Sequence, residues 1–313
     1  MTRVLVTGGA GFIGSHIARH WKERGAQVAV LDDFRTGHRA NVEGEGIEVF
    51  EGSILDRALV TRAAEGVDYV FHLAAMVSVV ESMQDPARCV DVNVHGTLNV
   101  LEAARRAGAR KVVLSSTAAV YGNEEGGLCG EGMPVRPISP YGITKLDGEL
   151  YLEMYRREHG LQTVSLRYFN VFGPRQDTRS PYSAVIPTFI ERALRGDDLI
   201  VHGDGSQTRD FVYVGDAVAA NVLAAETPDL VGPCNVGHGR ATSVVDLARV
   251  VLALVDSRSR IVHAPSRAGD IAHSTADISR LRAFGFSCAT SLEDGLRATV
   301  DWYRTLPLPG VSV

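Results

Sequence analysis

A short glycine-rich segment near the amino terminus constrains the fold of this chain more than any other feature. An apolar run from Val4 to Thr7 is followed at once by Gly8, and further glycines stand at Gly11 and Gly14. Glycines at this spacing let a strand turn sharply into a helix and let the backbone approach a pyrophosphate. The free N–H groups of the helix amino terminus then bind that anion. The segment therefore predicts a strand, a phosphate-binding turn and a helix in direct succession.

The pattern that follows predicts a doubly wound parallel sheet with helices on both faces, an α/β fold of the Rossmann type. We expect further strands at 27–31, 47–51, 69–73, 111–116 and 163–168. We expect helices at 11–25, 90–107 and 141–159. These buried strands are apolar runs because both faces of such a sheet are covered.

The second part of the chain has a different texture and predicts a smaller mixed α/β domain. Helices are expected near 184–195, 214–225, 244–255 and 292–304, joined by loops and short strands, with a loose tail from residue 306. We expect residues 1–168 to bind a dinucleotide, with parts of 209–236 returning to that domain. Residues 169–313 are expected to bind the substrate.

Asp32 indicates which dinucleotide the turn binds. It ends the second expected strand, where its carboxylate would accept hydrogen bonds from the adenosine ribose and repel a 2′-phosphate. This favours NAD over NADP, although Arg35 stands close enough in sequence to bind a phosphate.

A hydroxyl, a phenol and an amine form the expected catalytic group. The strand ending in Ser115-Ser116-Thr117 places Thr117 at the crevice beyond the carboxyl ends of the sheet. Tyr141 and Lys145 are four residues apart and share one helix face. A phenol with an ordinary pKa of about 10 becomes a base near neutrality if its pKa falls by about three units, which needs roughly 4 kcal/mol. A neighbouring ammonium and a nicotinamide cation both act in that direction.

Charge and cysteine content exclude several other classes of protein. A formal net charge of −5 gives no basic surface for nucleic acid. The four cysteines are far apart and form no CxxC pair, so we expect no metal site, no redox dithiol and a cytoplasmic location. No apolar run approaches the ~20 residues of a membrane span, so we expect neither a membrane span nor an export signal.

The motifs together resemble the extended short-chain dehydrogenase/reductases, in the nucleotide-sugar epimerase/dehydratase group. They are TGGAGFIGSH from Thr7, SSTAAVYG from Ser115, SPYGITK from Ser139, RYFNVFGPRQ from Arg167 and GDGSQTRDFVYVGD from Gly203. The resemblance covers nearly the whole chain. It implies an NAD cofactor that is reduced and reoxidised within each turnover, with Thr117, Tyr141 and Lys145 as the catalytic residues.

The resemblance also implies which residues contact the two ligands. Those expected to contact NAD are Gly8, Gly11, Phe12, Ile13, Gly14, Asp32, Asp33, Ser53, Ile54, Leu73, Ala74, Ala75, Asn93, Ser115, Tyr141, Lys145 and Tyr168. Those expected to contact a nucleoside diphosphate sugar are Thr117, Asn170, Arg209, Arg267, Asp270 and Ser274. Ser53 departs from the family, which usually has an aspartate there for the adenine amino group, so that contact is weakened.

Two alanines direct the expected reaction. Dehydratases of this group carry an acidic pair after the catalytic hydroxyl, where this chain has Ala118 and Ala119. The resemblance therefore implies 4-epimerisation of a UDP-hexose. Ser274, small where a bulky aromatic excludes an N-acetyl group, implies UDP-N-acetylglucosamine and UDP-N-acetylgalactosamine as substrates, with UDP-glucose and UDP-galactose accepted too.

Three alternatives stay open at this point. They are a nucleotide-sugar ketoreductase or dehydrogenase, an epimerase of UDP-uronic acids, and a non-catalytic NAD or nucleotide sensor. The helices near 93–107 and 141–159 resemble those that pair in family dimers, so we expect a homodimer.

Overall fold

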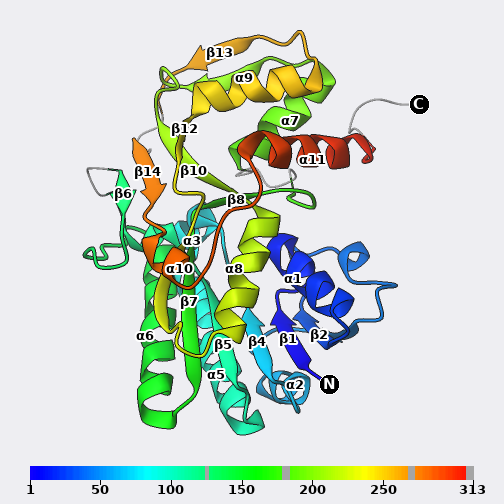
Figure 1. Cartoon of the computed structure of the whole chain (residues 1–313), viewed down its shortest axis with the longest axis vertical. Helices are drawn as coiled ribbons and strands as arrows, with labels where there is room; N and C mark the ends of the chain where they lie inside the picture. The colour runs from blue at the N-terminus through cyan, green and yellow to red at the C-terminus, as the bar shows by residue number, and fades with distance from the viewer. Residues whose placement is uncertain (124–126, 178–183, 267–271, 308–313) are drawn as a thin grey trace.

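The core of the protein is a seven-stranded sheet in which every neighbouring pair is parallel (Figure 1). The computed structural model describes residues 1–123, 127–177, 184–266 and 272–307. Across the sheet the order is β3 (Glu48–Glu51), β2 (Gln27–Asp32), β1 (Arg3–Thr7), β4 (Tyr69–His72), β5 (Lys111–Thr117), β7 (Gln162–Tyr168) and β11 (Gly232–Val236). This order confirms the predicted doubly wound α/β fold.

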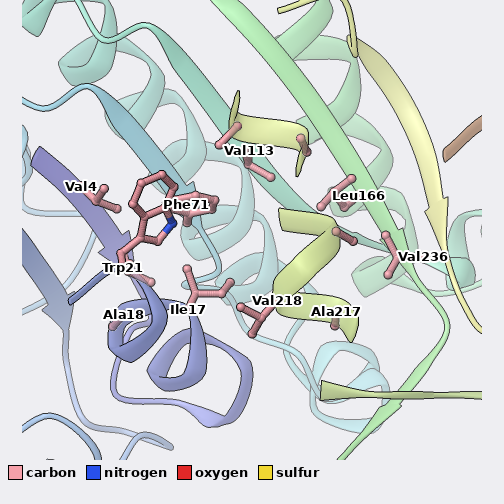
Figure 2. Close-up of a cluster of buried hydrophobic side chains, with 14 of the residues drawn as sticks. Val4, Ile17, Ala18, Trp21, Phe71, Val113, Leu166, Ala217, Val218 and Val236 are labelled. Carbon is pink, nitrogen blue, oxygen red and sulfur yellow. The ribbon is translucent and has the colours of Figure 1, made fainter. Parts of the chain in front are cut away.

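Helices cover both faces of this sheet because successive strand residues point to opposite sides. Val4 and Val6 of β1 pack in one apolar cluster with α1 (Phe12–Glu23) and α8 (Val214–Glu226). Figure 2 shows Trp21 of α1 against Phe71 in this cluster, with ring centroids 5.9 Å apart. Leu5 points the other way, into a cluster with α2 (Arg57–Ala63), α5 (Gly96–Ala107) and α6 (Pro140–His159). The alternation explains why these strands are apolar throughout.

One expected helix, at 90–107, is divided in the structure. α4 (Pro86–Val90) leads into a π-helical turn (Asp91–His95) and only then into α5. Asn93 lies in this wide turn, and its buried amide bonds to the backbone of Met76 in both directions. The prediction of one uninterrupted helix was therefore wrong, because a tertiary contact of a polar side chain shapes the turn. The same region also contains α3 (Val79–Gln84), which the sequence pattern did not predict.

Most of the remaining elements pack in a third apolar cluster of strands and helices, seen at the top of Figure 1. β10 (Thr208–Tyr213) pairs with β12 (Ala241–Ser243), β14 (His273–Ala276) and β8 (Asn170–Phe172), and β14 also pairs with β6 (Leu128–Cys129). β9 (Leu199–His202) pairs with β13 (Ile261–Ala264). The helices of this cluster are α7 (Val185–Arg195), α9 (Val244–Val255) and α11 (Leu292–Arg304), while α10 (Ser279–Ala283) lies beside β11.

The chain returns from these upper elements to the large sheet before its last quarter. α8 packs against α1, and β11 extends the sheet beside β7, with Asn235 opposite Arg167. None of the helices within the described ranges is long and apolar enough to cross a membrane.

Candidate active site

A cavity of about 1190 Å³ opens at the carboxyl ends of the parallel strands. The loops after β1, β2, β3, β4 and β7 and the end of β5 all contribute to its walls. In an open α/β sheet this is the edge where ligands bind, because the strand order reverses there and leaves a crevice. The cavity is large enough for a dinucleotide and a second ligand together.

The glycine turn at the floor of this cavity fits a pyrophosphate. Gly8 has a φ of +69°, and a Cβ there would lie 2.7 Å from the backbone nitrogen of Ala74. A Cβ on Gly14 would overlap the carbonyl oxygen of Gly8. The first residue of α1 is preceded by Gly11, which offers no side-chain cap, so the N–H groups of the first turn remain for a ligand.

Asp32 supports the same turn from the end of β2. Its carboxylate accepts the N–H of Ala10 at 2.9 Å and that of Phe34 at 2.9 Å. Burial raises the pKa of Asp32, and these two hydrogen bonds act against the rise. The side chain is only 7% exposed and lines the cavity, so its remaining lone pairs face the space where a ribose would lie.

Most residues expected to contact NAD lie around this one cavity. They are Gly8, Gly11, Phe12, Ile13, Gly14, Asp32, Asp33, Ser53, Ile54, Leu73, Ala74, Ala75, Ser115, Tyr141 and Tyr168. Asn93 and Lys145 do not line it. Asn93 instead bonds to Met76 and to the Thr144 hydroxyl at 3.0 Å, and the buried Lys145 lies behind the cavity wall.

Thr117, Tyr141 and Lys145 come together where α6 packs against the end of β5. Pro140 is the first residue of α6, and the Ser139 hydroxyl caps it by accepting the N–H of Gly142 at 3.1 Å. The Lys145 ammonium donates to the carbonyl oxygen of Ser115 at 2.8 Å. The Thr117 hydroxyl lies near enough to the Tyr141 phenol to lower its pKa, and both side chains line the cavity.

The protonation of this group reflects its burial. Burial raises the pKa of Tyr141 to about 12, and the hydrogen bond from Thr117 lowers it. Burial lowers the pKa of Lys145 to about 8. The protein alone therefore holds the phenol neutral at physiological pH. A cation in the cavity is the further contribution that would favour the phenolate.

His72 lies beneath this group without taking part in it. Its ring nitrogens bond to the hydroxyls of Thr7 at 2.7 Å and Thr97 at 2.9 Å. Burial lowers the pKa of His72 to about 3, so the ring is neutral. It joins β1, β4 and α5 below the cavity.

The expected substrate residues are only partly brought together. Asn170 lines both the main cavity and an adjoining one of about 270 Å³, and its amide donates to the backbone oxygen of Asp210 at 3.1 Å. Arg209 lines the smaller cavity. Ser274 is paired with Arg209 across β14 and β10 but lines neither cavity. Arg267 and Asp270 lie outside the described residues.

Two loops of the cavity wall were missed by sequence reasoning. His38, after β2, bonds to the Asp177 carboxylate at 3.0 Å, and Arg35 forms an ion pair with Glu81 of α3. Asp177 directly follows the quoted GPRQ motif, so its neighbourhood carried a signal. Within the segment at 34–38 the sequence pointed to Arg35 as a possible phosphate contact, but its ion pair with Glu81 joins distant segments and carried no signal. Among the described residues no cluster of His, Cys, Asp and Glu could hold a metal ion.

Comparison with known proteins assigns the family. The NAD dependent epimerase/dehydratase family matches residues 4–237. The chain belongs to this family. A putative UDP-glucose 4-epimerase of Methanocaldococcus jannaschii is 36% identical over 303 residues, 96% of this chain and 98% of that protein. A UDP-N-acetyl-alpha-D-glucosaminuronate decarboxylase of Bacillus cytotoxicus is 36% identical over 321 residues, 97% of this chain and 98% of that protein.

Solved structures of the family agree with this fold along almost its whole length. A UDP-N-acetylglucosamine 4-epimerase from Methanobrevibacter ruminantium, in complex with UDP-N-acetylmuramic acid, is 38% identical with a TM-score of 0.93. The match covers 97% of this chain and 98% of that one. A UDP-glucose 4-epimerase from Thermus thermophilus, in complex with NAD, is 40% identical with a TM-score of 0.89, covering 97% and 99%.

Proposed function

We propose that this protein is an NAD-dependent 4-epimerase of UDP-hexoses. The observation that carries the proposal is the contact of the Tyr141 phenol with the Thr117 hydroxyl in a cavity built for a dinucleotide. The family membership and the 4-epimerases among its relatives support the same assignment. Residues 1–168, with 209–236 in part, are proposed to bind NAD, and residues 169–313 the nucleotide sugar.

The residues of the site suggest how the proton moves. NAD, when bound, supplies the group that accepts hydride from C4 of the sugar and returns it. Tyr141 takes the proton of the C4 hydroxyl and later gives it back. Thr117 accepts the N–H of Ala119 at 3.1 Å, so its own hydroxyl proton is left to donate to the phenolic oxygen. The 4-keto sugar then rotates within the site, so that hydride is returned to the opposite face of C4.

The alanines after Thr117 argue against elimination of water. Ala118 and Ala119 stand in a short 3₁₀ turn (Ala118–Val120) directly after β5. Neither side chain can give or take a proton. A reaction confined to C4 therefore fits this site better than a dehydration, which needs an acid and a base at neighbouring carbons.

The nucleotide end of the substrate is proposed to lie in the smaller cavity. Arg209 and Asn170 line it, and Arg267 and Asp270 are proposed to complete the diphosphate and ribose contacts. A guanidinium fork matches phosphate oxygens. Ser274, paired with Arg209, is proposed to leave room for an N-acetyl group, so UDP-N-acetylglucosamine and UDP-glucose are both proposed substrates.

The experiment is a cofactor-free incubation. Purified protein is given UDP-N-acetylglucosamine or UDP-glucose without added NAD, and the epimers are resolved by chromatography. We expect both to be interconverted, with NAD retained in the protein. Tyr141→Phe should lower the rate about 10²- to 10⁴-fold, the range for loss of a general base. Activity on UDP-galactose with none on UDP-N-acetylgalactosamine would contradict the assignment of Ser274.

A second candidate is decarboxylation or epimerisation of a UDP-uronic acid, which the decarboxylase relative favours. The same incubation with UDP-glucuronic acid tests it through release of carbon dioxide or a change of epimer. Net conversion of one added NAD(H) per turnover would indicate a dehydrogenase or ketoreductase instead. NAD binding without any turnover, left unaffected by Tyr141→Phe, would indicate a sensor.

We further propose a homodimer formed through α6. Ile143, Leu150 and Met154 lie on one side of this helix and are 48%, 61% and 37% exposed. Val90, at the end of the neighbouring α4, is 40% exposed. Apolar side chains grouped in this way favour burial against a partner. Leu150→Glu should convert the dimer to a monomer in light scattering, and an unchanged mass would contradict the proposal.

We also propose a cytoplasmic location, which the four free cysteines support.

A further inference from the structure

A buried ion pair lies one helical turn beyond the catalytic residues of α6. Glu149 follows Tyr141 and Lys145 at the same spacing of four, so the three side chains share the helix side that faces the sheet. The Arg167 guanidinium of β7 donates to both Glu149 oxygens, from Nε at 2.9 Å and from Nη2 at 2.6 Å. The two side chains are only 4% and 6% exposed.

Glu149 completes a ladder between α6 and the end of β5. Three consecutive residues of the strand each interact with this helix: the Ser115 carbonyl accepts from Lys145, the Ser116 hydroxyl donates to Glu149 at 2.5 Å, and the Thr117 hydroxyl acts on the Tyr141 phenol. The proposed catalytic contact is the last of these three. Its geometry therefore depends on how the helix is seated by the other two.

The register of the sheet anchors Glu149 from the neighbouring strands. Ser116, Arg167 and Asn235 occupy adjacent positions on β5, β7 and β11. Arg167 also donates to the Tyr121 hydroxyl at 3.1 Å, and Tyr121 donates to Asn235 at 2.7 Å. Burial opposes the charge of Arg167, and the hydrogen bonds and charge of Glu149 outweigh it, which raises the pKa of Arg167. The guanidinium therefore stays charged inside the protein, and both Glu149 oxygens accept hydrogen bonds from it.

Asn235 extends this polar layer to the strands that carry the substrate side. Its amide donates to the backbone oxygens of Cys129 at 2.8 Å and Asp277 at 3.1 Å. Cys129 belongs to β6, which pairs with β14, and β14 pairs with the Arg209 strand β10. A continuous chain of hydrogen bonds thus joins the helix of Tyr141 to the sheet beside the smaller cavity.

We propose that Glu149 and Arg167 are positioning residues for the hydride-transfer reaction. They hold α6 against the end of β5 so that Tyr141 and Thr117 remain close together. Through Tyr121 and Asn235 they also connect α6 to the strands beside the smaller cavity. A purely structural role would be met by an apolar pair of similar volume, which often stabilises a core equally well. The inference rests on the proposed catalytic role of Tyr141.

The test compares Glu149→Gln with Leu161→Ala. The amide keeps the shape of Glu149 and removes its charge. Leu161 is buried just beyond the carboxyl end of α6, in one cluster with Leu152 and Tyr155, so its truncation weakens the packing of that helix end without touching the ladder. The readouts are melting temperature, kcat per bound NAD, KM, and the phenolate absorbance of Tyr141 against pH, referenced to Tyr141→Phe in each background.

We expect Glu149→Gln to lower kcat per bound NAD by about 100-fold, the cost of a 1 Å misplacement, with KM little changed. The phenol should titrate at higher pH than in the parent protein, because the Thr117 hydrogen bond that lowers its pKa is lost. Leu161→Ala should lower the melting temperature while keeping kcat per bound NAD within about twofold. Equal kcat per bound NAD in the two variants, with the same phenol titration, would overturn the proposal.

A further variant covers the case in which Glu149→Gln does not fold. Ser116→Ala removes the middle contact of the ladder and leaves the ion pair intact. We expect a loss of about tenfold in kcat per bound NAD at an unchanged melting temperature, and an unchanged kcat would overturn the inference. If the parent protein converts no UDP-sugar, the proposed function fails, whereas the Tyr141 titration still tests the positioning role.

Discussion

Replacing Gly8 by alanine separates two costs that this position combines. Gly8 has a φ of +69°, which costs an alanine about 1–2 kcal/mol. Its new Cβ would also lie 2.7 Å from the nitrogen and 3.0 Å from the Cα of Ala74. Gly160, which ends α6 with a φ of +68°, has no atom within 4 Å of the same added carbon. Gly160→Ala is therefore a matched control for the backbone cost alone.

The magnitudes follow from these contacts. Crowding a packed region adds about 1–3 kcal/mol to the conformational cost, so Gly8→Ala should lose about 2–5 kcal/mol and Gly160→Ala about 1–2. For a chain of 313 residues, 1 kcal/mol corresponds to about 1.5 °C in melting temperature. Because Ala74 lines the cavity, its displacement should also weaken NAD binding by at least about tenfold, or 1.4 kcal/mol.

The assay is thermal unfolding of both variants with and without NAD, together with titration calorimetry of NAD into the cofactor-free proteins. We expect NAD to raise the melting temperature of Gly160→Ala as it does for the parent protein, and to raise that of Gly8→Ala less. If Gly8→Ala has the same melting temperature as Gly160→Ala and binds NAD with the affinity of the parent protein, then the turn is not closely packed against the loop after β4. The argument for a backbone-built pyrophosphate site would then be refuted.

Three further predictions concern single groups. Thr117→Ala should lower kcat about 100-fold, whereas Thr117→Ser, which keeps the hydroxyl, should stay near the parent rate in the same assay. Asp32→Asn should weaken NAD binding about tenfold in calorimetry, because a charge-assisted acceptor is replaced by a neutral one. The ratio of NAD affinity to NADP affinity should also fall. An NAD affinity equal to that of the parent protein would contradict the role of Asp32. Burial lowers the pKa of Lys111 from 10.5 to about 8, so the unfolded chain holds a proton that the folded chain loses between these values. Between these pH values, the free energy of unfolding of the parent protein in denaturant should therefore rise with pH relative to that of Lys111→Met. Parallel plots of the two free energies against pH would contradict this prediction.

Much of the site could be predicted because its chemistry is local in sequence. The glycine turn needs only neighbouring residues, since a strand, three glycines and a helix follow one another directly. The pairing of Tyr141 with Lys145 needs only the helical repeat. The limits of α6, from Pro140 to Gly160, are likewise signalled by a proline at its start and a glycine at its end.

Other features depend on contacts between distant segments. Asn93 and Lys145, which were expected beside NAD, do not line the cavity, and their positions depend on the π-helical turn and on the packing of α6. The smaller cavity joins Asn170 with Arg209 through strand pairing between β8 and β10. Sequence spacing does not reveal such pairing.

The amino-acid sequence by itself indicated the alternation of strands and helices in the large sheet, the phosphate-binding turn and the placing of Tyr141 and Lys145 on one helix face. These follow from residue periodicity and from the conformational freedom of glycine, which act over a few residues. Only the tertiary structure decided that Ser116, Arg167 and Asn235 stand side by side under α6. That arrangement depends on strand register, which is set by the packing of whole elements and cannot be read from any local segment.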